Sequence, residues 1–253
     1  LLKGFQNSIK AYENSPGRFF QSVSQASYDT WSDGPFGRTG DEVNKTISYY
    51  QKGPIFALML DLKIRHETKN KKSLDDVMRT LYYDFYKKLN RGYTEQEFRT
   101  VCEQIAGVRL DEFFNYVYTV STPDYKKYFG YAGLAIDTNP KVTDAAWLGI
   151  KASEKEGKLI IRDVDWLSPA WTEGFRRNQV ITKINGQDAS LALLNKLSKE
   201  QKAGDIVKLE MIINDVAKTI PVILGTKSEI GFEIKRKDVP TPLQQQILKT
   251  WLR

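Results

Sequence analysis

The sequence predicts a two-domain α+β protein in which an all-helical region precedes a region of short strands. Three observations support this division. The 253 residues suffice for two hydrophobic cores, helix-capping patterns recur before residue 125, and β-type runs with tight turns dominate after Gly130. Hydrophobic residues at 41%, charged residues at 27% and aromatic residues at 12% are ordinary for a globular protein. This composition excludes gross disorder.

The helical region contains a first helix that we expect to start at Ser15 and Pro16, with the serine as N-cap and the proline in the first turn. This helix should run toward Trp31. The glycine-rich residues 32–40 predict a loop after it. The next helix should begin at Gly53, and its apolar residues cover most of the helix circumference. We therefore expect it to be largely buried.

Capping boxes mark the following two helices. Residues 73–76 and 94–97 each place a hydroxyl residue three positions before a carboxylate and ahead of an apolar periodic segment. Gly107 is expected to end the second of these helices. Residues 110–120 predict a further aromatic-rich helix, which a proline shortly afterwards ends.

The second region is predicted to consist mainly of strands. One helical stretch, residues 190–199, interrupts them. The dipeptides Asn185-Gly186 and Asn214-Asp215 separate apolar runs and are typical of hairpin turns. The expected strands lie within residues 147–150, 158–164, 179–184, 206–213 and 219–224.

Scarce cysteine and histidine limit the chemistry that this chain can perform alone. The single cysteine, Cys102, excludes an internal disulfide and any multi-cysteine metal site. The single histidine, His66, has no second histidine four residues away, so we interpret it as a surface residue and not as a ligand. Zinc sites of the HExxH type and Ser-His-Asp triads need such partners. This chain alone is therefore not expected to be an enzyme or to hold a cofactor.

The charge distribution and the apolar runs bear on partners and location. The formal net charge is +7, but the basic residues are scattered, and the only tight groups are residues 69–72 and 235–237. We expect no nucleic-acid binding. The longest apolar run, residues 54–60, is too short for a membrane span, so no transmembrane segment is expected. No secretory signal is visible at Leu1, and we interpret the chain as a mature or truncated piece whose compartment, periplasmic, secreted or cytoplasmic, stays open.

Several strings in the second region carry a resemblance. Leu148-Gly149-Ile150 resembles the carboxylate-binding loop of a PDZ domain, in which backbone N–H groups converge on a peptide C-terminus. Residues 168–175 and 179–186 are similar to the SPAxxAGLxxGDxIxxINGx stretch of bacterial PDZ domains, with Asn178-Gln179 in place of Gly-Asp. The resemblance implies a partly open β-barrel or sandwich.

The same resemblance implies a peptide-binding groove. Its carboxylate loop and receiving strand edge would include Leu148, Gly149, Ile150 and Lys151, and the helix of residues 190–199 would supply the other wall with Leu191 and Leu194. The alternative is a PDZ fold that only packs against its neighbour and binds no peptide.

The first region resembles the glycyl aminopeptidase family of zinc metallopeptidases. The resemblance rests on residues 48–53 (Ser-Tyr-Tyr-Gln-Lys-Gly), on the helix that follows, and on residues 73–78, 92–94, 106–107, 113–114 and 131–134 in this order. A PDZ domain and an ending like residues 241–244 also recur in the family. The chain then corresponds to the C-terminal half of such a bacterial-type protein. Its predicted divisions are a helical subdomain at 1–128, a PDZ domain at 129–226 and a C-terminal extension at 227–253 that packs back on the body.

The resemblance assigns a catalytic role to Tyr50, the tyrosine of the Y-x-K-G motif. Its phenol would donate to the oxygen that becomes negative when a peptide carbonyl is attacked. Tyr49 is interpreted as structural, because adjacent helical positions point about 100° apart. Lys52 is expected to hold the local turn and Gly53 to allow close backbone approach.

The family carries HExxH and a downstream glutamate as zinc ligands, and this sequence contains neither HExxH nor a second histidine. The resemblance therefore implies that zinc belongs to the full-length protein, on an upstream catalytic domain before Leu1. That protein would release N-terminal Gly or Ala residues from peptides. Two alternatives remain: a non-catalytic PDZ adaptor that binds peptides, and an inactive peptidase homologue.

Overall fold

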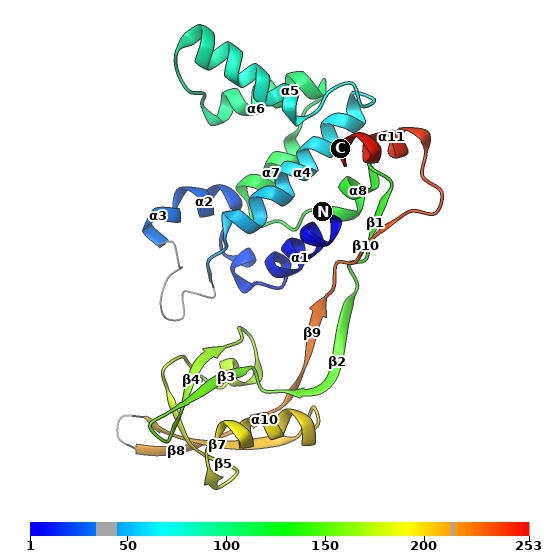
Figure 1. The fold of residues 1–253 in the computed structure, drawn as a ribbon. Coiled ribbons are helices and arrows are strands. Elements are labelled where there is room, and N and C mark those ends of the chain that lie inside the picture. Colours follow the sequence, from blue (N-terminus) through cyan, green and yellow to red (C-terminus); the bar gives the residue numbers. More distant parts are fainter. Residues whose placement is uncertain (34–44, 214–215, 253) are drawn as a thin grey trace. The chain divides into compact units, whose positions relative to one another are not determined.

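The computed structural model describes residues 1–33, 45–213 and 216–252, which form two compact units (Figure 1). The helical unit contains the described residues up to Asn139 and those from Gly231 onward. The β unit contains the described residues of Pro140–Ile230. Residues 231–252 thus pack within the helical unit, where the Thr250 hydroxyl lies 3.2 Å from Arg65 Nη1.

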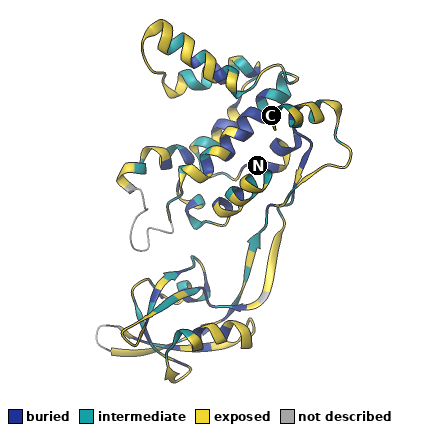
Figure 2. Ribbon diagram, viewed as in Figure 1, coloured by how far each residue is buried: buried dark blue, intermediate teal, exposed yellow. Residues whose placement is uncertain are grey.

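The helical unit is built around α4 (Tyr49–Glu67), which is buried over most of its length (Figure 2). Two short strands, β1 (Leu134–Ile136) and β10 (Ile234–Arg236), pair antiparallel in the same unit. This ribbon departs from the all-helical prediction. The other elements are α1 (Leu2–Glu13), the 3-10 turn η1 (Pro16–Phe19), α2 (Val23–Tyr28), α3 (Thr30–Asp33), α5 (Leu74–Thr80), the π-helical η3 (Leu81–Lys87), α6 (Glu95–Ala106), α7 (Asp111–Tyr118), α8 (Tyr125–Gly130) and α11 (Pro242–Trp251).

Both predicted capping boxes are present. The Ser73 hydroxyl accepts a backbone N–H of the first turn of α5 while the Asp76 carboxylate accepts the N–H of Ser73 at 2.9 Å. The Thr94 and Glu97 side chains cap α6 in the same reciprocal way. Gly107 ends α6 with φ +70°, a left-handed conformation that glycine adopts without a Cβ penalty.

The prediction of one helix from Ser15 to Trp31 is wrong. The chain forms the turn η1 and then α2, whose N-cap hydroxyl on Ser22 accepts the N–H of Gln25 at 3.1 Å. Tertiary packing constrains η1 itself, since a Cβ on Gly17 would lie 2.1 Å from the carbonyl oxygen of Thr46. The predicted loop also fails at its start, since residues 32 and 33 belong to α3, and residues 34–40 lie outside the described residues.

The β unit contains an antiparallel ribbon and a six-stranded sheet, and its described residues form no closed barrel. In the sheet the strand order is β3-β4-β5-β7-β8, with β6 also paired to β5; β2 pairs with β9 in the ribbon. The strands are β2 (Pro140–Trp147), β3 (Ile150–Lys155), β4 (Lys158–Val164), β5 (Val180–Ile184), β6 (Gln187–Asp188), β7 (Ile206–Ile213), β8 (Val216–Ile223) and β9 (Gly225–Ile230). Two helices, α9 (Pro169–Thr172) and α10 (Leu191–Glu200), complete the unit.

Two turns of the β unit adopt positive φ angles at asparagine and glycine residues. Asn185 and Gly186 both have positive φ, 51° and 81°, as a two-residue hairpin turn requires. Asn178 takes φ +69° at the position where the PDZ pattern quoted above has glycine, and the Gln179 side chain accepts the N–H of Arg176 at 2.7 Å. The turn before β5 therefore forms with Asn178-Gln179 in place of Gly-Asp. The second predicted hairpin dipeptide, Asn214-Asp215, lies outside the described residues.

The predicted strand at residues 147–150 is wrong. Trp147 ends β2 and Ile150 starts β3, because Gly149 between them has φ +86° and breaks the extended conformation. Both units have cores of fully buried apolar residues, such as Phe129 and Leu62 in the helical unit and Phe175 and Val207 in the β unit. Over the ranges that the structure describes, no helix is both long and apolar enough to span a bilayer.

Candidate functional site

Tyr50 lies in the first turn of α4 and is 74% exposed. Its ring centroid is 4.2 Å from that of Tyr49, and a side-chain hydrogen bond with Tyr50 is the main cause that raises the pKa of Tyr49. The two adjacent rings therefore lie side by side, contrary to the expectation that they diverge. Pro54 has no N–H to donate to the Tyr50 carbonyl, so the first turn of α4 lacks one helical hydrogen bond.

A narrow exposed stripe runs along the otherwise buried α4 from Tyr50. Pro54 and Ala57 follow it at four and seven positions, the spacing of one helix face, and both are exposed. Ala57 also lines the wall of a cavity of about 1010 Å³ within the helical unit. Tyr50 and the cavity-lining Ala57 therefore lie on the same face of α4, and Tyr50 itself does not line the cavity.

The cavity wall is mainly apolar and aromatic. It is formed by α2, α4, α5, α6, α7 and Tyr93, and includes Phe56, Leu60, Met78, Phe98, Phe113, Phe114 and Tyr118. None of these residues was singled out from the sequence as a site residue. The available signal was the aromatic-rich periodicity of residues 110–120, which equally predicts a core face.

Lys52, on the buried side of α4, is fully buried. Its Nζ lies 4.6 Å from the ring centroid of Tyr12 and 5.2 Å from that of Phe56, and it has no hydrogen-bond partner among the described residues. Burial lowers the pKa of Lys52 to about 8, against a raising effect from Glu13. Lys52 thus holds the start of α4 in the core. Gly53 meets no described atom within 4 Å of an added Cβ, so close backbone approach does not explain it.

The Lys52 ammonium should make stability depend on pH. Because its pKa is lower in the folded state, the unfolded state binds more protons between about pH 8 and 10.5, and the free energy of unfolding rises with pH there. Relative to Lys52→Met, the native chain should gain about 2 kcal/mol between pH 7.5 and 9.5. Urea unfolding of both chains at the two pH values measures this. Parallel pH profiles for the two chains would contradict a buried charged amine.

The described residues do not fit a zinc ion. No three His, Cys, Asp or Glu side chains in that part of the chain come together as ligands. His66 is half-buried and stacks on Tyr131 with ring centroids 4.2 Å apart, which corrects its interpretation as a surface residue; burial lowers its pKa. Cys102 is buried, and burial raises the pKa of its thiol to about 12, so it is no ready ligand.

The loop between β2 and β3 engages its carbonyl groups in hydrogen bonds within the β unit. The carbonyl of Leu148 accepts the N–H of Ala170 at 3.1 Å, and that of Gly149 accepts the N–H of Asp165 at 2.8 Å. The backbone N–H groups of Leu148 and Gly149 donate no hydrogen bond to any described residue. The carbonyls of this loop are therefore engaged, whereas its two amides have no described acceptor.

A cavity of about 200 Å³ lies between this loop and α10. Four of the six residues predicted to bind peptide line it: Leu148, Gly149, Ile150 and Leu194. The other two do not. Lys151 forms ion pairs with Asp163 at 2.9 Å and Asp165 at 3.3 Å, and Leu191 starts α10 and packs against the core.

Residues that were not predicted complete this cavity. Trp147 donates from Nε1 to Asp165 Oδ2 at 3.2 Å, and Lys227 on β9 lies 3.9 Å from the same carboxylate. Asn195 and Ser198 add polar groups from α10. Nothing in the sequence indicated that Lys227 lies in this cavity, because the residues of β9 show no alternation of apolar and polar side chains.

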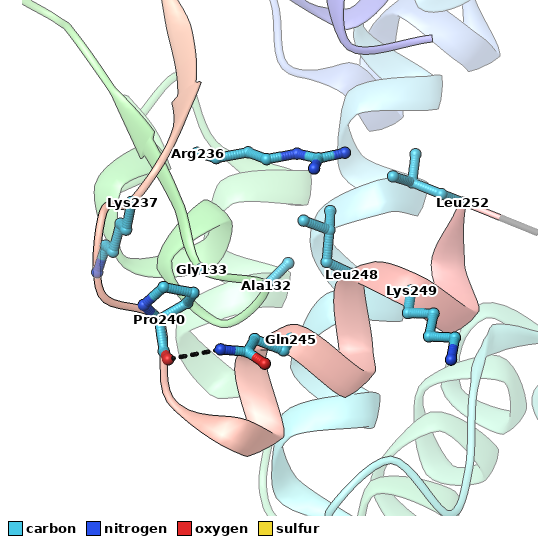
Figure 3. Close-up of a pocket in the computed structure, with 9 residues that line it drawn as sticks. All are labelled: Ala132, Gly133, Arg236, Lys237, Pro240, Gln245, Leu248, Lys249 and Leu252. Carbon is cyan, nitrogen blue, oxygen red and sulfur yellow. Dashed lines mark hydrogen bonds between the residues drawn. The ribbon is translucent and has the colours of Figure 1, made fainter.

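A further cavity, of about 430 Å³, lies in the helical unit between the β1–β10 ribbon and α11 (Figure 3). Ala132 and Leu248 lie in its wall, and Gln245 donates from Nε2 to the carbonyl of Pro240 at 3.2 Å. Arg236, Lys237 and Lys249 supply the charged part of the lining. None of the predicted site residues lies there.

Comparison with known families adds to these observations. Residues 1–56, which include Tyr50 and Lys52, match the M61 glycyl aminopeptidase family, and residues 146–224 match the PDZ domain family. These matches are consistent with the C-terminal region of an M61 peptidase. They support a peptidase-associated function for this M61-like chain and a PDZ identity for the β unit.

One solved structure matches the fold of the whole chain. An aminopeptidase N family protein from Idiomarina loihiensis is 20% identical with a TM-score of 0.75, and the match covers 100% of this chain and 44% of that one. The chain thus spans less than half of that relative. A PDZ domain of a carboxy-terminal protease from Vibrio cholerae, solved in complex with peptide, is 16% identical with a TM-score of 0.29, covering 34% of this chain and 98% of that one. No curated protein matches the chain.

Proposed function

We propose that this chain is the C-terminal part of a zinc-dependent aminopeptidase that releases N-terminal glycine or alanine from peptides. One observation carries the proposal. Tyr50 lies within the segment that matches the glycyl aminopeptidase family, and its side chain is exposed at the start of a buried helix. An exposed phenol held by a rigid element suits a group that must meet substrate.

The proposed role of Tyr50 is to donate a hydrogen bond to the oxygen of the peptide carbonyl under attack. That oxygen gains negative charge in the transition state, so a donor aimed at it stabilises the transition state more than the ground state. α4 holds the donor, because its buried side, including Lys52, anchors the helix in the core.

Zinc is assigned to the longer protein. The described residues offer no ligand set, and the relative from Idiomarina loihiensis is more than twice as long as the matched region. We propose that the zinc ligands and the general base belong to the preceding catalytic region of such a protein, and that the helical unit supplies Tyr50 to that site.

The β unit is proposed to bind peptide C-termini. The amides of Leu148 and Gly149 would receive the terminal carboxylate, and the cavity beside Leu194 would receive the last side chain. The extended peptide would add to the edge of β3.

The test of the aminopeptidase assignment is the substrate profile of the longer protein. The p-nitroanilides of Gly, Ala, Leu and Phe are compared with N-acetylglycine p-nitroanilide. Gly and Ala substrates should be hydrolysed fastest, and the acetylated substrate should resist hydrolysis because its N-terminus is blocked. Hydrolysis of the acetylated substrate at a similar rate would rule out an aminopeptidase.

A further inference from the structure

The groove beside β3 is crossed by a side chain at the end opposite the carboxylate loop. Glu154, near the end of β3, accepts the backbone N–H of Leu191 on its Oε1 at 2.6 Å. Leu191 is the first residue of α10, the helix that forms the other wall. The hydrogen bond therefore joins the two walls of the groove.

The direction of the Glu154 side chain follows from the alternation along the strand. Ile150 and Ala152 pack against the core of the β unit, and Glu154 is the next residue of the same set. β3 is an edge strand, so its outer backbone groups are open to an added peptide. Glu154 thus extends over the space that a peptide between β3 and α10 would enter.

The contact is favourable for both partners. A carboxylate that accepts a backbone N–H in the first turn of a helix gains a charge-assisted hydrogen bond and a favourable interaction with the helix dipole. The Ser190 hydroxyl already caps α10 by accepting the N–H of Leu193 at 3.1 Å, and Glu154 satisfies another free donor of that turn. Displacing Glu154 would leave the Leu191 N–H without this partner.

We infer that Glu154 closes the groove and that the β unit selects short peptides. Glu154 lies four residues after Ile150 on β3, a distance of about 13 Å along an extended strand. This length of groove accommodates about three or four residues of a bound peptide. A longer ligand must displace Glu154 or bend away from β3. The ligand class is therefore short peptides with a free carboxylate, and not the tails of folded proteins. This inference rests on the proposed peptide binding.

The test uses calorimetric titration of the 253-residue chain with N-acetylated peptides of three and eight residues. A three-residue and an eight-residue peptide form a pair that shares its last three residues, and the four pairs end in Ala, Val, Leu or Phe. The C-terminal amide of each peptide shows how much of the affinity depends on the free carboxylate. Lengthening the ligand should leave the affinity unchanged or lower it. Glu154→Ala should bind the eight-residue peptide at least fivefold more tightly than the native chain does, with less than a twofold change for the three-residue peptide.

Glu173→Ala is the matched control, because it removes the same charge from an exposed position that does not line the groove cavity. It should leave both affinities unchanged. If the native chain bound the eight-residue peptides more tightly than the three-residue peptides, the inference would be overturned while the proposed peptide binding would stand. This comparison does not depend on the folding of any variant. Equal binding of acids and amides, or no binding at all, would overturn the proposed peptide binding itself.

Discussion

Replacing Tyr50 by phenylalanine in the longer protein is expected to lower kcat by about a hundredfold or more, since removal of one oxyanion donor costs about 3 to 4 kcal/mol of transition-state stabilisation. KM should change little, because the lost hydrogen bond forms mainly in the transition state. Stability should change by less than about 0.5 kcal/mol, because the side chain is 74% exposed. Steady-state kinetics on a glycyl substrate and urea unfolding measure the two effects.

Tyr49→Phe is the control for this change. Tyr49 is adjacent and half-buried, and its ring contacts that of Tyr50. We expect a much smaller loss of turnover than in Tyr50→Phe, because Tyr49→Phe removes only a hydrogen bond with Tyr50 and leaves the Tyr50 phenol in place. A Tyr50→Phe enzyme with native turnover, or a larger loss in Tyr49→Phe than in Tyr50→Phe, would remove Tyr50 from the proposed role.

Replacing Gly149 by alanine should destabilise the β unit by about 3 kcal/mol or more and abolish peptide binding. An added Cβ would lie 2.1 Å from the Cβ and 2.3 Å from the Oγ of Ser168, and Gly149 has φ +86°. Ser168 cannot easily move, because it is fully buried and its hydroxyl caps α9 by accepting the N–H of Trp171 at 3.1 Å. Urea unfolding and calorimetric titration with the same peptides report the two losses.

Gly186→Ala is the control that distinguishes the cost of a left-handed backbone conformation from the cost of steric overlap between residue 149 and Ser168. Gly186 has a similar φ, +81°, but an added Cβ meets no atom within 4 Å. This variant should therefore show only the left-handed backbone cost of about 1 to 2 kcal/mol and bind peptides normally. Equal destabilisation by the two substitutions would show that Ser168 does not constrain the carboxylate loop.

Local signals predicted the parts of the fold where neighbouring residues decide the structure. The reciprocal caps at Ser73 and Thr94, the αL stop at Gly107 and the turn at Asn185-Gly186 all satisfy backbone groups within a few residues. Such features need no tertiary information. The helix α4 was also identified as buried, although it begins at Tyr49 and not at Gly53.

Tertiary contacts decided the features that were missed. Gly17 in η1 packs closely against Thr46, which lies 29 positions away. The β2–β9 ribbon pairs segments that lie far apart in the sequence, and Ala146 is the one buried residue among their described side chains. The PDZ groove was located to its loop and helix, but Trp147, Asp165 and Lys227 meet there only through folding. Likewise, the bridge between Glu154 and Leu191 has no counterpart in the local sequence pattern.

The central proposal is that this chain completes the active site of a zinc aminopeptidase whose metal ligands lie elsewhere in a longer protein. The most direct measurement compares the longer protein and the 253-residue chain side by side for bound zinc and for hydrolysis of glycine p-nitroanilide. We predict about one zinc per chain and hydrolysis in the longer protein, with neither in the shorter one. Absence of both zinc and activity from the longer protein would contradict the claim.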